Sequence, residues 1–147
     1  MYRNSRHFLV DITGEEPESL GLPLVAREEA EAREHGATCF GIRLKETRQM
    51  VGAAVYQPSG YGGEPACAWL ALLMISEPHQ KRGYGAEAYR LIESAIFAQP
   101  GVNAIKLAVL VNNPAGLCFW EKMGYTKLTT RKHIQGGHDV VVMGKNR

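Results

Sequence analysis

Cysteine is scarce in this sequence of 147 residues, which contains three: Cys39, Cys67 and Cys118. None belongs to a Cys-x-x-Cys pair, and an odd number leaves one thiol over in any disulfide pairing. The pattern excludes a disulfide framework and a zinc knuckle, so we expect no bound metal. Such isolated thiols are typical of a reducing compartment, and we expect a cytoplasmic protein.

The sequence also lacks a long apolar run and an excess of charge of one sign. No apolar stretch reaches the roughly 18 residues that a membrane span needs, and no targeting segment is expected. Seventeen basic and fifteen acidic residues give a formal net charge of +2, spread along the chain. We therefore expect neither a membrane nor nucleic acid as partner. With 45% hydrophobic residues, we expect one domain over residues 1–147.

The first half of the chain predicts short strands joined by loops. Residues 8–13 are apolar and β-branched, which predicts a strand, and residues 24–35 predict a short surface helix. Residues 38–44 and 51–57 flank a polar stretch, as the strands of a hairpin do. Residues 58–65 are rich in glycine and proline and predict a loop.

In the second half, two apolar stretches predict strands covered on both faces. Residues 66–75 carry no charge and are expected to form the central strand, and residues 104–111 form a second buried strand. Residues 126–131 and 140–145 predict a closing strand pair.

Each of the two buried strands is followed by a predicted helix. Apolar residues at helical spacing predict one from Gly83 to a Pro-Gly stop at residues 100–101. Asn113 and Pro114 fit the N-cap and first position of another, which ends before Gly124. This order of elements predicts an α+β fold, a mixed α/β sandwich.

The stretch of residues 76–86 joins the central strand directly to a helix. Gly83 and Gly85 leave the backbone N–H groups at the helix start open, and Lys81 and Arg82 add positive charge. Unpaired N–H groups and the helix dipole attract anions, so the stretch predicts a pyrophosphate site. An ordinary loop that turns on glycine is the alternative. The spacings of a Walker loop and of a dinucleotide fingerprint are absent.

Two motifs in register resemble those of the GNAT superfamily of N-acetyltransferases. The letters QKRGYG at residues 80–85 match the family's phosphate loop, [QR]xxGx[GA], between its fourth strand and third helix. Residues 113–125 resemble the family's NPAA-like helix start and its FYxxxG[FY] end. The motifs cover about residues 69–125, and residues 1–65 agree only in the order of elements. The resemblance implies a central mixed, mostly antiparallel sheet flanked by helices.

The resemblance also implies acetyl-CoA as co-substrate, in a cleft where the fourth and fifth strands splay apart. The pantetheine arm would run beside the backbone of Leu73, Met74 and Ile75. Asn113 would contact this arm, with helix capping as its alternative role. The pyrophosphate would bind the loop residues Gln80, Lys81, Arg82, Gly83, Tyr84, Gly85 and Ala86.

A primary amine acceptor must lose a proton before it can attack the thioester. An amine with a pKa of ~10.4 lies about 3.4 units above neutral pH, so its free base costs roughly 4.6 kcal/mol. The family often places a carboxylate on or beside the fourth strand, but residues 68–75 contain no ionisable group. The candidate bases are the loop residues Glu77, His79, Glu64 and His138. For each, a solvated surface side chain is the alternative.

Trp120 stands where the family motif has the tyrosine that protonates the CoA thiolate. An indole N–H donates a hydrogen bond but no proton at neutral pH, which excludes acid catalysis by Trp120. A thiol of pKa ~8.5 lies only about 1.5 units above neutral pH, so water can supply this proton. Core packing is the alternative role of Trp120.

The sequence thus predicts an acetyl-CoA-dependent N-acetyltransferase. It would transfer the acetyl group directly to a primary amine of a small molecule or peptide in a ternary complex. Backbone N–H groups near Met74 and Ile75 would polarise the thioester carbonyl, as the resemblance implies. The rivals are an acyl-CoA-binding sensor or scaffold without catalysis, and a protein that binds another phosphorylated ligand. The acceptor and the oligomeric state stay open, a homodimer included.

Overall fold

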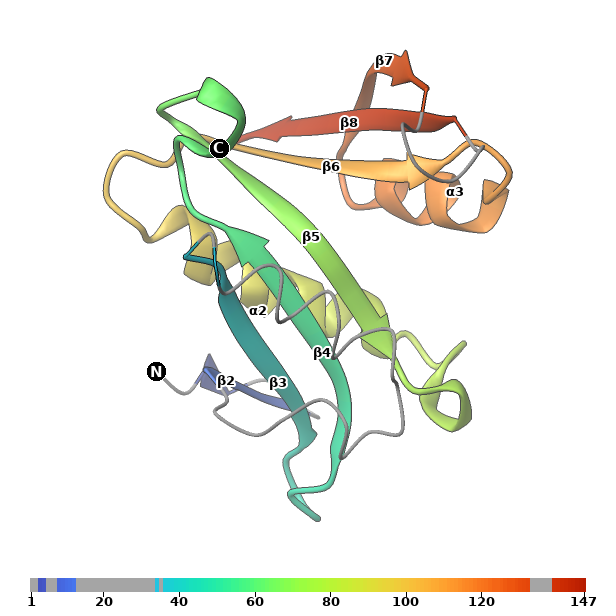
Figure 1. The fold of residues 1–147 in the computed structure, drawn as a ribbon. Helices are drawn as coiled ribbons and strands as arrows, with labels where there is room; N and C mark the ends of the chain where they lie inside the picture. Colours follow the sequence, from blue (N-terminus) through green and yellow to red (C-terminus); the bar gives the residue numbers. More distant parts are fainter. Residues whose placement is uncertain (1–2, 5–7, 13–33, 35, 133–138) are drawn as a thin grey trace.

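The computed structural model describes residues 3–4, 8–12, 34, 36–132 and 139–147. The strands among these residues form one sheet (Figure 1). Its eight described strands lie in the order β1-β2-β3-β4-β5-β6-β8-β7. Neighbouring strands are antiparallel except for the parallel pair β5 and β6. The strands are β1 (Arg3–Asn4), β2 (Phe8–Ile12), β3 (Thr38–Leu44), β4 (Met50–Gln57), β5 (Cys67–Ile75), β6 (Ala104–Leu110), β7 (Thr126–Arg131) and β8 (Val140–Asn146). A mixed, mostly antiparallel sheet is thereby confirmed.

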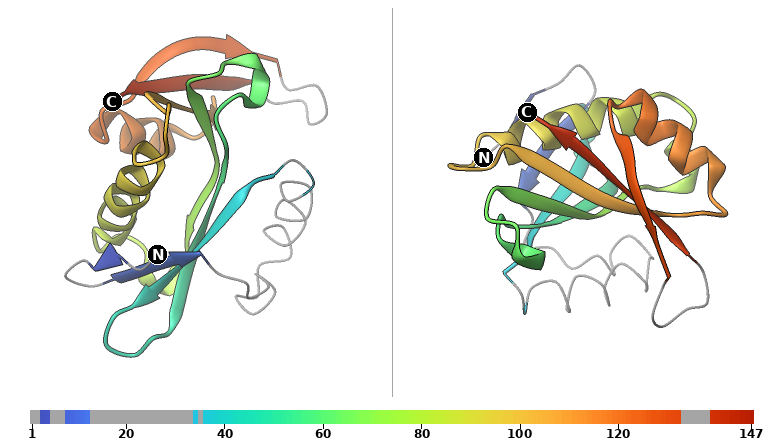
Figure 2. Two further views of the ribbon diagram at one scale, coloured as in Figure 1. Left: turned by 90° about the vertical axis from the view of Figure 1, so that its left-hand side faces the viewer. Right: turned by 90° about the horizontal axis from the view of Figure 1, so that it is seen from above.

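The α-helices α2 (Tyr84–Phe97) and α3 (Pro114–Lys122) lie on the same face of this sheet (Figure 2). Both were predicted close to these bounds. The short 3-10 helix η2 (Tyr61–Gly63) falls in the predicted loop before β5, and η3 (Glu77–His79) follows β5. The helix predicted over residues 24–35 lies, apart from Glu34, outside the described residues. None of the helices in the described ranges is long and apolar enough to cross a membrane.

The main core lies between the sheet and its two helices. Four residues of α2 are buried at positions that share one side of a helix: Ala88, Tyr89, Ile92 and Ile96. They pack in one cluster with inward-facing residues of β3 to β6 and β8. This spacing is the local signal that predicted the helix, and the cluster holds α2 against the sheet.

The prediction that residues 104–111 are covered on both faces was wrong, and for residues 66–75 it failed only at Ala71. In β6, Ile105, Leu107 and Val109 are buried, whereas Ala108 and Leu110 are exposed, and Ala71 of β5 is exposed too. Leu110 remains 41% exposed. These three uncharged side chains line a cleft.

Candidate active site

β5 and β6, which correspond to the fourth and fifth strands of the expected fold, pair only at their first residues. In the described part of the chain, their pairing ends with Trp69 opposite Lys106. β5 goes on to pair with β4 as far as Ile75, and β6 with β8 as far as Leu110. The two strands therefore splay apart, which Figure 1 shows as the V between them. The predicted splay is confirmed.

An extra residue in β5 accompanies the splay. Leu70 opposes Tyr56 and Leu72 opposes Val55, so Ala71 has no partner on β4. A bulge of this kind bends its strand and increases the local twist. Because Ala71 lies two residues after the last pair with β6, the bend occurs where the two strands separate.

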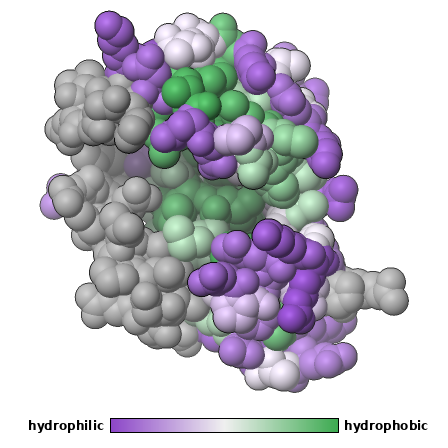
Figure 3. All heavy atoms as spheres, turned by 90° about the vertical axis from the view of Figure 1, so that its right-hand side faces the viewer, coloured by the Kyte–Doolittle hydropathy of each residue, from purple (hydrophilic) through white to green (hydrophobic). Residues whose placement is uncertain are grey.

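The splayed strands and α3 enclose a groove of about 220 Å³. Figure 3 views the side of the molecule that lies at the right in Figure 1, and it shows an apolar area between hydrophilic regions. None of the side chains that line the groove is charged: Leu70, Ala71, Leu72, Leu73, Leu107, Ala108, Val109, Leu110, Asn113 and Trp120. The groove can accept an uncharged, extended chain, and the backbone edge of β5 that β6 leaves unpaired borders it.

The loop after β5 is held tightly at its start. The Ser76 N–H donates to the Val51 carbonyl at 2.7 Å, and the Ser76 hydroxyl lies 2.9 Å from His79 Nδ1. The Gln80 side-chain amide donates to the Ile75 carbonyl at 2.8 Å. Gln80 was predicted to bind the pyrophosphate, and in this structure its side chain fixes the loop to the end of β5.

The loop turns into α2 through two residues in the left-handed region, Lys81 at φ 59° and Gly83 at φ 79°. Gly83 is the N-cap of α2, and an added Cβ there would meet no atom within 4 Å. Lys81 and Arg82 are exposed at this helix end. Backbone N–H groups of a first helical turn point out of the helix, so the loop presents open backbone, helix dipole and two cations together.

Gly85, in the first turn of α2, differs from Gly83. Its φ is not positive, and an added Cβ would lie in ordinary van der Waals contact with the Phe119 ring on α3, at 3.6 Å. Neither backbone conformation nor packing requires glycine at position 85, whereas Gly83 supplies the turn.

Asn113 caps α3 as predicted: its Oδ1 accepts from the Gly116 N–H at 2.9 Å. The same residue lines the groove, so capping occupies its oxygen and leaves the amide nitrogen for other contacts. Both proposed roles of Asn113 are compatible with this position.

Trp120 forms part of the groove wall and packs on three other aromatic rings. Its ring lies edge-on to those of Tyr89 and Phe119, each at 4.9 Å, and of Tyr125 at 5.3 Å between centroids. The indole therefore serves core packing and faces the cleft at once.

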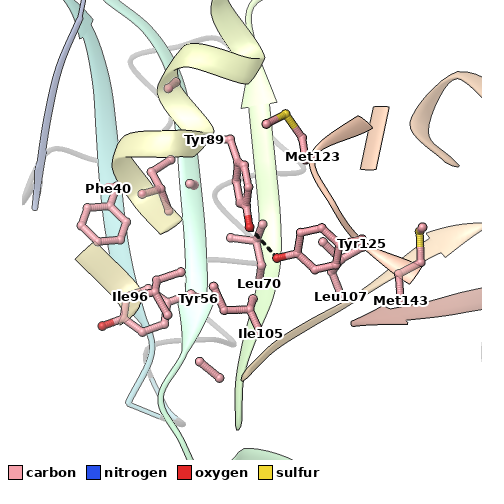
Figure 4. Packing of buried hydrophobic residues seen from close by; sticks show 14 of the residues in the cluster. Phe40, Tyr56, Leu70, Tyr89, Ile96, Ile105, Leu107, Met123, Tyr125 and Met143 are labelled. Carbon is pink, nitrogen blue, oxygen red and sulfur yellow. Dashed lines mark hydrogen bonds between the residues drawn. The ribbon is translucent and has the colours of Figure 1, made fainter. Parts of the chain in front are cut away.

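Beside Trp120, the Tyr89 and Tyr125 hydroxyls form a buried hydrogen bond of 2.6 Å (Figure 4). Burial raises the pKa of both phenols well above its usual value. Glu93, which pairs with Lys145, adds negative charge near both phenols. Sequence reasoning missed this pair because the two residues lie 36 positions apart and only Tyr125 belongs to a motif.

The candidate bases lie at opposite ends of the cleft. Glu77 is exposed in η3 and His79 is half-buried, and both sit beside the phosphate loop. Glu64, in the loop before β5, forms an ion pair with Lys106, with 2.5 Å between its Oε1 and the Lys106 Nζ. Lys106 is the β6 residue in the last β5–β6 pair. His138 lies outside the described residues. Within the described ranges, no three or more His, Cys, Asp or Glu residues are grouped so as to hold a metal ion.

Solved structures share this fold. A spermidine N-acetyltransferase from Vibrio cholerae in complex with CoA and spermine is 15% identical, with a TM-score of 0.77 over 97% of this chain and 96% of that one. An acetyltransferase from Thermus thermophilus is 24% identical, with a TM-score of 0.66 over 84% of this chain and 73% of that one. At these identities the likeness shows the fold alone.

Sequence comparison identifies the family. None of the curated proteins matches this chain. The model of the Acetyltransferase (GNAT) family matches residues 6–125, which include the splayed strands, the phosphate loop and α3. The chain is an acyltransferase and belongs to the GNAT acetyltransferase family.

Proposed function

We propose that this protein transfers an acetyl group from acetyl-CoA directly to a primary amine in a ternary complex. The observation that carries the proposal is the uncharged groove between β5 and β6, together with the Gly83 turn into α2 that follows β5 in the chain. A ligand with an extended neutral arm and a charged pyrophosphate matches these two parts.

The donor fits the residues present. Its pyrophosphate would bind the open backbone at Gly83, assisted by Lys81 and Arg82, because no side chain fills the space beside that glycine. The pantetheine amides would pair with the β5 backbone at Leu73, Met74 and Ile75. With these N–H groups engaged by the arm, the thioester would lie beyond Leu73, toward the bulge at Ala71, where backbone N–H groups of β5 would stabilise negative charge on its oxygen.

In the transfer, the amine nitrogen bonds to the thioester carbonyl carbon, the C–S bond breaks, and CoA leaves as thiolate. The acceptor's proton needs a base, and Glu64, Glu77 and His79 are the described candidates. Because Trp120 cannot supply a proton, CoA leaves as a free thiolate, which for a thiol of ordinary pKa lies roughly 2 kcal/mol above the thiol at neutral pH, and we infer that water then protonates it.

Release of free thiol from acetyl-CoA, measured across a panel of amines, tests this function. We expect at least one amine to give saturable thiol release together with the N-acetylated product. No release with any amine, from a folded protein that binds acetyl-CoA, would favour the sensor or scaffold.

Thermal shift separates the ligand classes. We expect acetyl-CoA and desulfo-CoA to raise the melting temperature, and ATP and NAD to raise it less, because only CoA compounds fill both groove and loop. Equal shifts with all four would favour a general phosphate-binding protein.

A further inference from the structure

Two buried polar atoms in the described part of the chain have no hydrogen-bond partner: Gln57 Oε1 and Trp69 Nε1. Gln57 is only 6% exposed. Buried polar side chains in folded proteins are nearly always paired, and an unpaired one requires an explanation. Here a donor and an acceptor occur together, which suggests one group that satisfies both.

These residues belong to one row across three strands. Gln57 of β4 is the register partner of Trp69 of β5, and Trp69 is the partner of Lys106 of β6. Side chains of register partners point to the same face of a sheet. Their chain neighbours belong to the core cluster on the helix-bearing face: Tyr56, Leu70 and Ile105. The row therefore points to the face away from α2.

The row stands at the closed end of the cleft, where β5 and β6 still pair. The phosphate loop lies at the other end, so a donor that binds as proposed extends from α2 toward Trp69. Its acyl group would approach the closed end, and an acceptor that reaches it from that end passes the row.

The chemistry of the row selects the group it can bind. The Trp69 N–H only donates and Gln57 Oε1 only accepts, so a matching group must accept one hydrogen bond and donate another. A hydroxyl or an amide does both. An ammonium group has no lone pair to accept from Trp69, and the one nearby cation of the row, Lys106, is already paired with Glu64.

The loop before β5 covers the indole. A Cβ added at Gly62 would lie 3.5 Å from Trp69 Nε1, and Gly60, Gly62 and Gly63 all have positive φ. Glu64 ties this loop to Lys106 through a solvent-exposed ion pair, a type of contact that contributes little to stability. Displacing residues 60–63 would uncover the indole N–H.

We propose that Gln57 and Trp69 bind a hydroxyl or amide group of the acceptor, so that the enzyme prefers amines carrying such a group to alkylamines and polyamines. This inference rests on the proposed acetyl transfer and names the acceptor class. Gln57 and Trp69 are specificity-determining residues in it, and Glu64 is the candidate base nearest to them along the sheet.

The indole N–H resonances test the contact without catalysis. The chain has two tryptophans, so the ¹⁵N-labelled protein gives two indole signals, and Trp69→Phe assigns them. The probes are 3-amino-1-propanol, β-alaninamide, butylamine and spermidine, each added to the CoA-saturated protein. We expect the Trp69 signal to shift with the first or the second probe, which tells hydroxyl from amide, and not with butylamine or spermidine.

Kinetics test the same contact during transfer. We expect the wild type to prefer the responding probe to butylamine at least about tenfold in kcat/KM. In Gln57→Met and in Trp69→Phe the preference falls to within about threefold, while the KM for acetyl-CoA stays unchanged. Gln49→Met, which changes an exposed glutamine in the β3–β4 turn, is the matched control and keeps the wild-type preference.

Three results would overturn the inference. In the first, the Trp69 indole signal moves with none of the probes or equally with all four. In the second, the wild type shows no preference for the responding probe over butylamine. In the third, both variants keep the wild-type preference and melt at a higher temperature, as expected if the two unpaired atoms are only a packing defect. Failure of the proposed function can be distinguished from failure of this inference. In that case no amine causes thiol release, while the indole N–H signals can still be measured with each probe.

Discussion

The first residues of β5 and β6 and the later residues of the same strands are similar in composition apart from Lys106, but only the first residues pair with each other. Over residues 67–69 of β5 the two strands pair backbone to backbone. From Leu70 onward β5 pairs with β4 but not with β6, and β6 continues to pair with β8. Composition therefore does not separate the two parts. The bulge at Ala71, and α3 with Trp120 at the groove, distinguish the open part from the closed one.

Deletion of Ala71 should have the largest effect on this difference. Without the extra residue, Leu70 and Leu73 still face the helices and Leu72 still faces away, so the core is preserved. The strand loses its bend, and we expect acetyl-CoA affinity to fall at least about 100-fold with the fold intact. Calorimetry measures the affinity, and circular dichroism measures the fold.

The control is deletion of Leu128, the extra residue of β7 at the sheet edge, which is 52% exposed. It should leave the affinity unchanged. Equal affinity in both deletion variants and the wild type would show that the bulge does not open the cleft.

Gly83→Val tests the open end of the cleft. Valine in the left-handed region is strained, and its methyl groups would occupy the space beside the phosphate loop. We expect a loss of acetyl-CoA affinity of at least about tenfold. Gly101→Val is the matched control, because Gly101 also has φ 79° and open space around its Cβ position but lies after α2. Similar losses of affinity in both would mean that strain alone is responsible.

The buried phenols beneath the groove wall predict alkaline destabilisation. The pKa of Tyr89 and of Tyr125 is raised in the folded protein, so their contribution to stability is present below about pH 10, where unfolded tyrosine titrates, and is lost as pH rises above it. Each group should lower the folding constant by roughly tenfold per pH unit there. Urea unfolding from about pH 9 to about pH 11 measures the slope. Tyr125→Phe should flatten it; an unchanged slope would contradict the assignment.

Lys81→Ala with Arg82→Ala should have a smaller effect than the glycine change. Both side chains are exposed, so we expect about a fivefold loss of acetyl-CoA affinity at low salt, shrinking as ionic strength rises. The rate at saturating acetyl-CoA should stay the same. A lower saturating rate with unchanged affinity would place these cations in the chemical step instead.

Trp120→Phe should have the smallest effect. Phenylalanine keeps an aromatic ring against Tyr89 and Tyr125 and removes the indole N–H, so the saturating rate should stay within about threefold. Trp120→Tyr should be neutral or faster. A loss of about a thousandfold in a folded Phe variant that binds acetyl-CoA would show that the N–H is required.

Local signals were enough for most of the elements. The apolar spacing of α2, the Asn113 cap with Pro114, and the glycines around the phosphate loop act within a few residues, so they could be read from the sequence. The family motifs added the splayed strands to this picture. The cofactor-binding assignments made from those motifs remain predictions.

Side-chain neighbours across strands could not be predicted in the same way. The row of Gln57, Trp69 and Lys106 depends on the registers of two strand pairs, one of which contains the bulge at Ala71. A shift of one residue would turn each side chain to the other face. No single stretch of sequence contains that information.

The sequence by itself determined the glycine turn into α2, the helices α2 and α3 and the family, because these depend on spacings within short segments. Tertiary structure alone decided that uncharged residues of β5 and β6 line a cleft, that Tyr89 meets Tyr125, and that Gln57 and Trp69 lie side by side with one polar atom of each unpaired. The physical reason is that apolar composition favours burial without saying against what, while the partner of each group is set by register and by the bend of a strand.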